Sequence, residues 1–216
     1  MNIITIKAKL VSSPEPPPFV GTRIGLEIPA DDPRWRLNIA SLCEGHDFAT
    51  IDWDDGTIEE SDDPCAIEHT YAEPGHYEVR ISDDIEEFQF SDLSTLYRKM
   101  VGRIVSFESN ATLLTEIRAR CFNYGTNLQT VTLRDSHVEK IGTLAFANCP
   151  LLSGRIDLPH VADISCSSAS GEPFYSSPSI AELHFAKANE ATLKASSAYG
   201  HDPTFGAKNA QVRFDL

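Results

Sequence analysis

The sequence has no apolar run close to the roughly 20 residues that a membrane-spanning helix needs, and it has no excess of basic residues. Its 216 residues include 18 Lys and Arg against 32 Asp and Glu, which gives a net charge of −14 at neutral pH. Phosphate-binding surfaces need a basic footprint, and anionic membranes attract basic segments. The composition therefore argues against a nucleic-acid partner and predicts no membrane insertion.

The first residues also lack the features of a secretory signal. Residues 1–7 alternate apolar and polar side chains like a strand, with no basic start and no long apolar stretch behind it. We therefore expect that the protein stays inside the cell, leaves it by another route, or has a signal outside this sequence.

Cysteine is scarce, and the thiols do not form a metal-binding pattern. The five cysteines are Cys43, Cys65, Cys121, Cys149 and Cys166. An odd number with no Cys-x-x-Cys pair argues against a zinc site. Cys43 and Cys65 could form a disulfide in an oxidising compartment; otherwise the thiols are reduced and partly buried.

The common catalytic motifs are missing as well. There is no Gly-rich phosphate loop, no His-Glu-x-x-His and no Gly-x-Ser-x-Gly sequence, and the histidines are scattered. We therefore predict no catalytic residue, no metal and no cofactor. That the protein is an enzyme is kept as an alternative hypothesis, which would place the active site at Cys166 or around Asp54.

The negative charge is confined to the first part of the chain. Residues 1–90 hold 20 Asp and Glu against 6 Lys and Arg, whereas residues 91–216 hold 12 of each kind. This break coincides with the start of a periodic pattern, and it predicts two domains, residues 1–88 and 89–216. The acidic excess serves solubility or, alternatively, forms a cation-binding face.

Short β-prone segments separated by turns fill the first domain. Residues 13–18 form a proline-rich break, and Asp54-Asp55-Gly56 is a hairpin signal because glycine adopts positive φ at no steric cost. Many short strands with turns between them are typical of a β-sandwich. The expected strands span residues 3–10, 23–28, 36–40, 49–53 and 77–81.

Two segments of this domain resemble the signature of the PKD family. Residues 51–57 read IDWDDGT and residues 69–79 read HTYAEPGHYEV, in the order and spacing that this family shows. The resemblance covers about residues 36–82. It implies an immunoglobulin-like sandwich that acts as a spacer or protein-interaction module outside the cell.

On this interpretation the aromatic residues of the two segments are structural. Trp53 fills the space between the sheets, and Tyr71 and Tyr77 close the core with hydroxyls that reach the backbone. The resemblance makes His69 structural too. The carboxylates around Asp54 form the turn and aid solubility or, alternatively, bind calcium.

The second half contains a repeat of apolar landmarks. Ile117, Phe122 and Leu128 recur as Ile141, Phe146 and Leu152, then as Ile164, Phe174 and Ile180, with offsets of 141 − 117 = 24 and 164 − 141 = 23. A β-prone piece follows each copy, at residues 131–133, 156–158 and 183–185. A period of this length predicts a solenoid, in which each unit buries its apolar face against its neighbours.

Before the first copy we expect a helix at residues 91–100 and a strand at 103–107. Val105 and Phe107 would match Val131 and Leu133, which makes this piece the cap or the first turn of the solenoid. A degenerate fourth copy runs from Leu193 to Phe214.

The repeats resemble the BspA-like leucine-rich repeats. Residues 141–152 read IGTLAFANCPLL, and residues 156–159 supply a short strand followed by proline. The resemblance implies a short parallel sheet with short helical or irregular segments. Phe122, Phe146, Phe174 and Phe205 would form one buried ladder and the three isoleucines another. Cys149 would be a small buried hydrophobe.

Two insertions interrupt the repeats at similar places, residues 165–172 and 195–203. Insertions in repeat proteins often project from the binding face, although loops without function would have the same composition. The candidate binding residues in and beside them are Ser168, Glu172, Tyr175, Tyr199 and His201.

The fold class that we predict is therefore an N-terminal all-β immunoglobulin-like sandwich followed by a C-terminal leucine-rich-repeat solenoid. The resemblances imply a non-catalytic bacterial surface or secreted protein that binds an unidentified protein or glycan. The alternative is a structural or spacer module of a larger assembly, such as a cell envelope or a phage particle.

Overall fold

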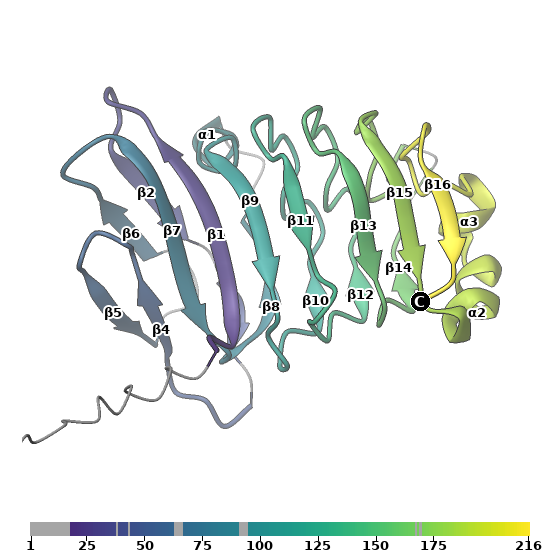
Figure 1. The fold of residues 1–216 in the computed structure, drawn as a ribbon, viewed down its shortest axis with the longest axis horizontal. Coiled ribbons are helices and arrows are strands. Elements are labelled where there is room, and N and C mark those ends of the chain that lie inside the picture. The colour runs from purple at the N-terminus through teal and green to yellow at the C-terminus, as the bar shows by residue number, and fades with distance from the viewer. Residues whose placement is uncertain are drawn as a thin grey trace, which may run out of the picture.

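The structure is a computed structural model, and it describes residues 18–37, 39–42, 44–62, 67–90, 95–166, 168 and 170–216. It consists mostly of β-strands in several sheets, with few and short helices (Figure 1). No helix in these ranges is long and apolar enough to cross a membrane. The predicted strand 3–10, residues 13–17 of the proline-rich break, and the residues Cys43 and Cys65 lie outside the described residues.

Residues 21–88 form strands that pair largely in antiparallel fashion. β1 pairs with β7, β4 pairs with β5 and β7, β2 pairs with β6, and β3 pairs with β8. The predicted strands at 23–28, 49–53 and 77–81 are confirmed within one to two residues, and the one at 36–40 divides between β2 and β3. The strands are β1 (Gly21–Ile28), β2 (Arg34–Leu37), β3 (Ile39–Leu42), β4 (Ala49–Asp52), β5 (Ile58–Ser61), β6 (Ile67–Thr70), β7 (Gly75–Ser82) and β8 (Ile85–Phe88).

Residues 95–216 pair mainly in parallel, each unit with the next. β9 pairs with β11, β10 with β12, β12 with β14, β13 with β15, and β15 with β16. The elements are α1 (Thr95–Val101), β9 (Ile104–Ser109), β10 (Glu116–Ile117), β11 (Thr130–Thr132), β12 (Lys140–Ile141), β13 (Gly154–Leu158), β14 (Asp163–Ile164), β15 (Ile180–Phe185), the 3-10 helix η1 (Lys187–Asn189), α2 (Glu190–Ala195), α3 (Ser197–His201) and β16 (Gln211–Phe214). In Figure 1 the strands β9, β11, β13, β15 and β16 stand side by side in chain order.

The predicted isoleucine ladder is present. Ile117 is the register partner of Ile141, which is the partner of Ile164, and all three are buried. The ladder has one further rung, because Phe88 pairs with Ile117 from β8. The ladder therefore begins inside the first predicted domain.

The phenylalanine ladder is confirmed for its first three members. The rings of Phe122 and Phe146 stack at 5.0 Å, and those of Phe146 and Phe174 stack at 5.4 Å, with interplanar angles of 6° and 7°. Phe205 is also buried, but its ring makes edge contacts with Phe185 and Tyr199. The fourth unit therefore packs differently from the first three.

The register expected for β9 is wrong. Phe107, not Val105, is the register partner of Val131, so the offset is 131 − 107 = 24 rather than 26. Burial explains this register, because Phe107 is 1% exposed whereas Val105 is only half-buried. Of the two roles expected for this segment, the end cap is wrong because β9 pairs with β1 on its other side, whereas the parallel pairing of β9 with β11 agrees with a first turn of the repeats. The predicted helix before it begins at Thr95 within the described residues.

The aromatic core of residues 18–88 matches most of the expectations. Trp53 is fully buried, stacks on His69 at 4.6 Å and meets Trp35 edge-on at 6.2 Å. The Tyr77 hydroxyl donates to the Glu73 carbonyl at 2.8 Å, as predicted. The expectation for Tyr71 is wrong, since its buried hydroxyl has no hydrogen-bond partner in the described part of the chain. Its ring packs against Tyr77 at 4.0 Å instead.

Sheet and core both continue across residue 88. One six-stranded sheet has the order β11-β9-β1-β7-β4-β5, and one hydrophobic cluster includes both Trp53 and Phe205. Phe90 contacts Trp35 at 5.9 Å and Phe122 at 5.3 Å, so aromatic packing bridges the two parts. The boundary at residue 88 stays a prediction.

Close stacking of the repeat units depends on Gly142. A Cβ atom at this position would lie 2.3 Å from the backbone nitrogen of Ala119 in the preceding unit. Because that neighbour is backbone, no side-chain rotation could make room for it. Gly142 follows Ile141 directly, which explains why the repeat has glycine after isoleucine here.

Candidate functional site

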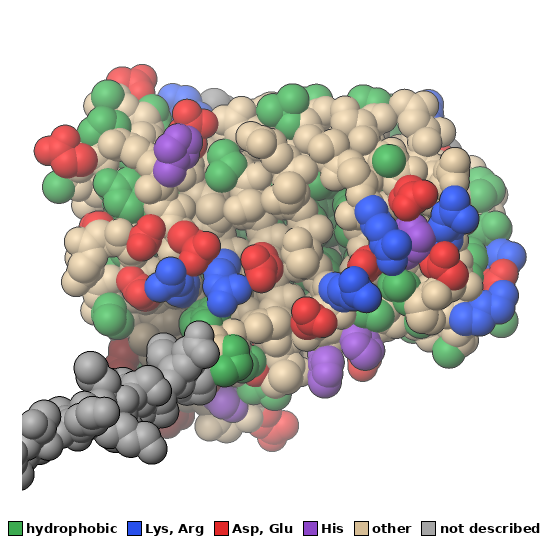
Figure 2. Space-filling view, viewed as in Figure 1, with side chains coloured by type: hydrophobic (Ala, Val, Ile, Leu, Met, Phe, Trp, Pro, Cys, Tyr) green, Lys and Arg blue, Asp and Glu red, His purple; other side chains and the backbone are tan. Residues whose placement is uncertain are grey.

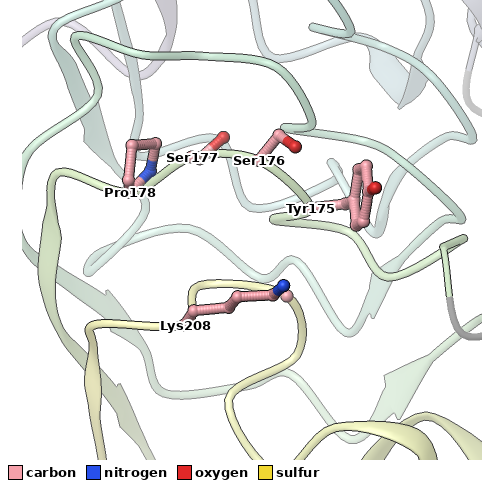
Figure 3. Close-up of a pocket in the computed structure, with 6 residues that line it drawn as sticks. Tyr175, Ser176, Ser177, Pro178 and Lys208 are labelled. Carbon is pink, nitrogen blue, oxygen red and sulfur yellow. The ribbon is translucent and has the colours of Figure 1, made fainter.

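The candidate site is a pocket of about 290 Å³ between the turns of the last two units. Tyr175, Ser176, Ser177 and Pro178 form one wall, and Gly206 and Lys208 belong to the other (Figure 3). Tyr175 is one of the residues predicted from the sequence. The pocket is therefore the place where a sequence candidate and a concave surface coincide.

Regular backbone hydrogen bonds join the corresponding turns of the earlier units. The amide of Tyr124 donates to the Ala147 carbonyl at 3.0 Å, and the amide of Asn148 donates to the Tyr175 carbonyl at 2.8 Å. Both donors have left-handed φ, 67° and 56° respectively, and Ser176 has the same conformation with φ 57°. Ser176 is thus the next donor in this series.

The series ends at Ser176, whose amide has no hydrogen-bond partner among the described residues. The cause is a slip of the last unit. The backbone amides of Phe122 and Phe146 donate to the carbonyls of Ala145 and Pro173, which are the residues just before the next ladder phenylalanine. The amide of Phe174 instead donates to the carbonyl of Phe205 itself, at 3.1 Å. This slip leaves the pocket where the next carbonyl would have been.

Gly206 lets the two walls of the pocket approach each other. Its φ is +91°, and a Cβ atom there would lie 2.6 Å from the Tyr175 nitrogen and 2.9 Å from Glu172 Cβ. Only glycine fits both the conformation and the contact. The residue that follows Phe205 is therefore fixed by packing against the unit before it.

The polar groups of the pocket differ in whether they are already used. Ser177 is buried, accepts from the Cys149 amide at 3.1 Å and donates to the Phe146 carbonyl at 2.8 Å, so it is structural. Lys208 is exposed and has no ion-pair partner in the described ranges. By contrast, Lys194 contacts Glu190 at 2.6 Å. Lys208 and the Ser176 amide are therefore two donors of the pocket that no acceptor among the described residues occupies.

The structure places Glu172 and Ser168 differently from each other. Glu172 is 1% exposed, and its Oε2 atom has no hydrogen-bond partner among the described residues. Its carbonyl accepts from the Tyr175 amide at 3.2 Å, so Glu172 and Tyr175 come together against Gly206. Ser168 is exposed, and its carbonyl accepts from the Cys166 thiol at 2.9 Å.

Tyr199 and His201 lie on α3 rather than in a loop. The predicted insertion 195–203 is largely helical, and Ser196 caps α3 by accepting from the Tyr199 amide at 3.2 Å. The Tyr199 ring is half-buried and packs on Phe205 at 5.7 Å, whereas His201 is exposed at the helix end. Neither residue lines the pocket beside Tyr175.

Sequence reasoning missed Ser176 and Lys208. The left-handed backbone of Ser176 carries no sequence signal, because serine does not require positive φ. Lys208 lies in the most degenerate unit, where no landmark marks the turn. The one signal available was position, since Asn148 and Ser176 both lie two residues after a ladder phenylalanine.

A second polar feature covers the outer face of the strands. Figure 2 shows basic and acidic side chains gathered over β13, β15 and β16. Arg155 contacts Asp157 at 2.5 Å, and the His184 ring nitrogens contact Asp215 at 2.7 Å and Glu182 at 3.0 Å. The hydrogen bond to His184, helped by Arg213 and Arg155, lowers the pKa of Glu182 despite some desolvation. These charges are therefore paired with one another.

The described cysteines are poor nucleophiles. Burial raises the pKa of Cys121, and it raises that of Cys149 to about 12. Burial also raises the pKa of Cys166, and the nearby Glu172 adds to this while the Ser168 backbone opposes it. Since the thiolate is the reactive form, Cys166 is less reactive than an ordinary cysteine. Cys149 is fully buried, as expected for a small hydrophobe.

The carboxylates around Asp54 build the hairpin between β4 and β5. Asp52 accepts from the Asp54 amide at 3.0 Å, Asp55 accepts from Thr57 at 3.0 Å, and Asp54 accepts from the Glu78 amide at 2.8 Å. Asp55 also contacts His69 Nε2 at 2.7 Å. Within the described ranges, no group of three His, Cys, Asp or Glu side chains is arranged to hold a metal ion.

No protein-family model, curated protein or solved structure matches this chain.

Proposed function

We propose that this protein is a non-catalytic binding protein of a bacterial cell surface, which recognises a protein or glycan partner. In this proposal residues 1–88 act as a PKD-like, immunoglobulin-like sandwich and residues 89–216 as a BspA-like leucine-rich solenoid. The parallel ladder from Ile117 to Ile164 supports the second part. The antiparallel strands around Trp53 support the first.

The pocket beside Tyr175 is the observation that carries the binding function. It is concave, it lies between successive turns, and its free polar groups are not used by the fold. Binding pockets typically combine an apolar wall with a few such groups that fix the orientation of a ligand. Turns along one side of a repeat protein are a common place for recognition.

A binding screen of the whole chain against extracellular-matrix proteins and a glycan panel tests this proposal. The informative variant is Tyr175→Ala, since shortening residues 165–172 would remove the buried Glu172. The matched control is Tyr124→Ala, because Tyr124 is 36% exposed on the corresponding turn of an earlier unit. A saturable hit that is lost with the first variant and kept with the second supports the proposal.

The second candidate function is a structural or spacer module of a cell envelope or phage particle. It is favoured by the ion pairs that cover the outer strand face, because charged side chains that already pair with one another are less available to bind a partner. Correctly folded protein that binds nothing in the screen would move the assignment to this role.

A further inference from the structure

We infer that the pocket beside Tyr175 binds the carboxylate of a single acidic sugar residue. This inference rests on the proposed binding function and names the class of ligand. It is carried by three features of the pocket: a backbone donor without an acceptor among the described residues, a lysine without an ion pair to any of them, and a half-buried aromatic ring.

The backbone donor defines where a ligand oxygen would sit. In the two preceding turns a carbonyl oxygen lies 3.0 Å from the Tyr124 amide and 2.8 Å from the Asn148 amide. Ser176 has the same left-handed backbone but lacks that oxygen among the described residues. A ligand oxygen can therefore complete the series at Ser176 as a carbonyl does elsewhere.

Lys208 favours a negatively charged ligand oxygen at this position. Figure 3 shows its side chain running along the wall opposite Ser176, with the ammonium toward Tyr175. It has no carboxylate partner within the described ranges, although the chain carries a net charge of −14. An N–H donor and an ammonium on residues that line the same pocket suit a carboxylate, because charge-assisted hydrogen bonds are the stronger kind.

The remaining features favour a sugar over a peptide as the source of the carboxylate. The Tyr175 ring is half-buried at one end of the pocket and offers a flat apolar surface to a sugar ring (Figure 3). The volume of about 290 Å³ is small, and it suits one ring rather than an extended chain. A terminal uronic or similar acid has the size and charge required.

The test is an NMR titration of the whole isotope-labelled chain with methyl glucuronide, methyl glucoside and an amidated, acetylated aspartate. The two sugars differ only in the carboxylate, and the third probe carries the same charge on a peptide unit. The variants are Lys208→Met and, as control, Lys187→Met, which removes an exposed lysine outside the pocket.

We expect the glucuronide to shift the Ser176 amide resonance. Its affinity should fall about tenfold or more with Lys208→Met and stay unchanged with Lys187→Met. The glucoside should bind about tenfold more weakly than the glucuronide. Equal binding of both sugars, or equal affinity with Lys208→Met, would overturn the role of the carboxylate.

The other outcomes separate this inference from the proposed function. Binding of the aspartate probe as tight as that of the glucuronide would overturn the sugar assignment and point to a peptide partner. No glucuronide binding would overturn the whole inference. The proposed function would nevertheless stand if a partner from the screen still depended on Tyr175, and it would fall only if that dependence were also missing.

Discussion

The two tryptophans of residues 18–88 and the first three ladder phenylalanines of the repeats pack in contrasting ways. In the first region the rings of Trp35 and Trp53 meet edge-on at 77°. In the repeats Phe122, Phe146 and Phe174 stack almost parallel. The stacked form follows from translation, because each unit places the same side chain one strand spacing further along.

Strand pairing differs in the same sense. Ile24 pairs with Val79, which is 79 − 24 = 55 residues away, whereas Ile117 pairs with Ile141 of the next unit. Long-range pairing closes a large loop at once, and nearest-neighbour pairing adds one small loop at a time. The first region should therefore open only as a whole, whereas local opening of the repeats below the global transition should increase unit by unit toward their C-terminal end.

The largest expected effect comes from the ring that joins the two regions. Phe90→Ala removes the contacts with Trp35 and Phe122 and should lower the free energy of unfolding by about 3–5 kcal/mol. We expect calorimetry to show one thermal transition in the unmodified protein and two in the variant.

Phe48→Ala is the control, because Phe48 is 46% exposed and its loss should change stability by about 0.5 kcal/mol or less. Phe90→Leu provides a milder change if the alanine variant does not fold. Two separate transitions in the unmodified protein would contradict the shared core and would instead support independent domains that divide near residue 88.

The next effect concerns stacking within the repeats. Gly142→Ala forces a Cβ atom against the Ala119 backbone, and it should cost about 1–3 kcal/mol. Hydrogen exchange should rise most in β13, β15 and β16, which follow the damaged contact, and least in β1 and β7. Gly75→Ala is the matched control, since its Cβ would meet only Tyr77 at 3.8 Å. Uniform loss of protection would show that the repeats are not coupled as nearest neighbours.

These contrasts also explain how far the sequence could predict the fold. The isoleucine ladder can be predicted from the sequence because identical residues recur at nearly constant spacing, at Ile117, Ile141 and Ile164. Phe88 belongs to the same ladder, yet 117 − 88 = 29 and its strand also pairs with β3, so no period reveals it. The register of β9 could not be predicted for a different reason. Val105 and Phe107 are both apolar and lie two residues apart, so either could have paired with Val131, and only their burial in the structure distinguishes them.

The candidate site was harder to predict than the ladders. Tyr175 could be proposed from its place beside an insertion, but the pocket exists because Phe174 bonds to Phe205 one residue out of step. A slip in backbone register leaves no mark in composition or period. Glu172 shows the converse problem. A charged residue in an insertion is expected to be exposed, but the structure buries Glu172 to 1% exposure.

A smaller effect on stability is expected from the charge of Asp55, in the acidic first region. Burial would raise the pKa of Asp55, but hydrogen bonds from His69 and Thr57 outweigh it and lower that pKa. A lowered pKa means that the folded state favours the ionised carboxylate. The resulting stability is present above the unfolded value, near about 3.9, and is lost as pH falls through the folded value.

Asp55→Asn therefore should cost about 1 kcal/mol at neutral pH, because the site is partly screened by solvent. The difference from the unmodified protein should shrink below about pH 4. Denaturant unfolding at several pH values measures this. A difference that is constant down to pH 2 would show that the Asp55 charge does not stabilise the fold.

The smallest effect tests whether surface charge contributes to the stacking of the units. Lys140 and Glu116 form an ion pair of 3.1 Å between β12 and β10, directly beside the buried pair of Ile141 and Ile117. Lys140→Met should change the free energy of unfolding by about 0.5 kcal/mol or less, and added salt should abolish the difference. Denaturant unfolding at low and high salt measures both values. A loss as large as that of Gly142→Ala would mean that charge, rather than the buried isoleucine and phenylalanine ladders, holds neighbouring units together.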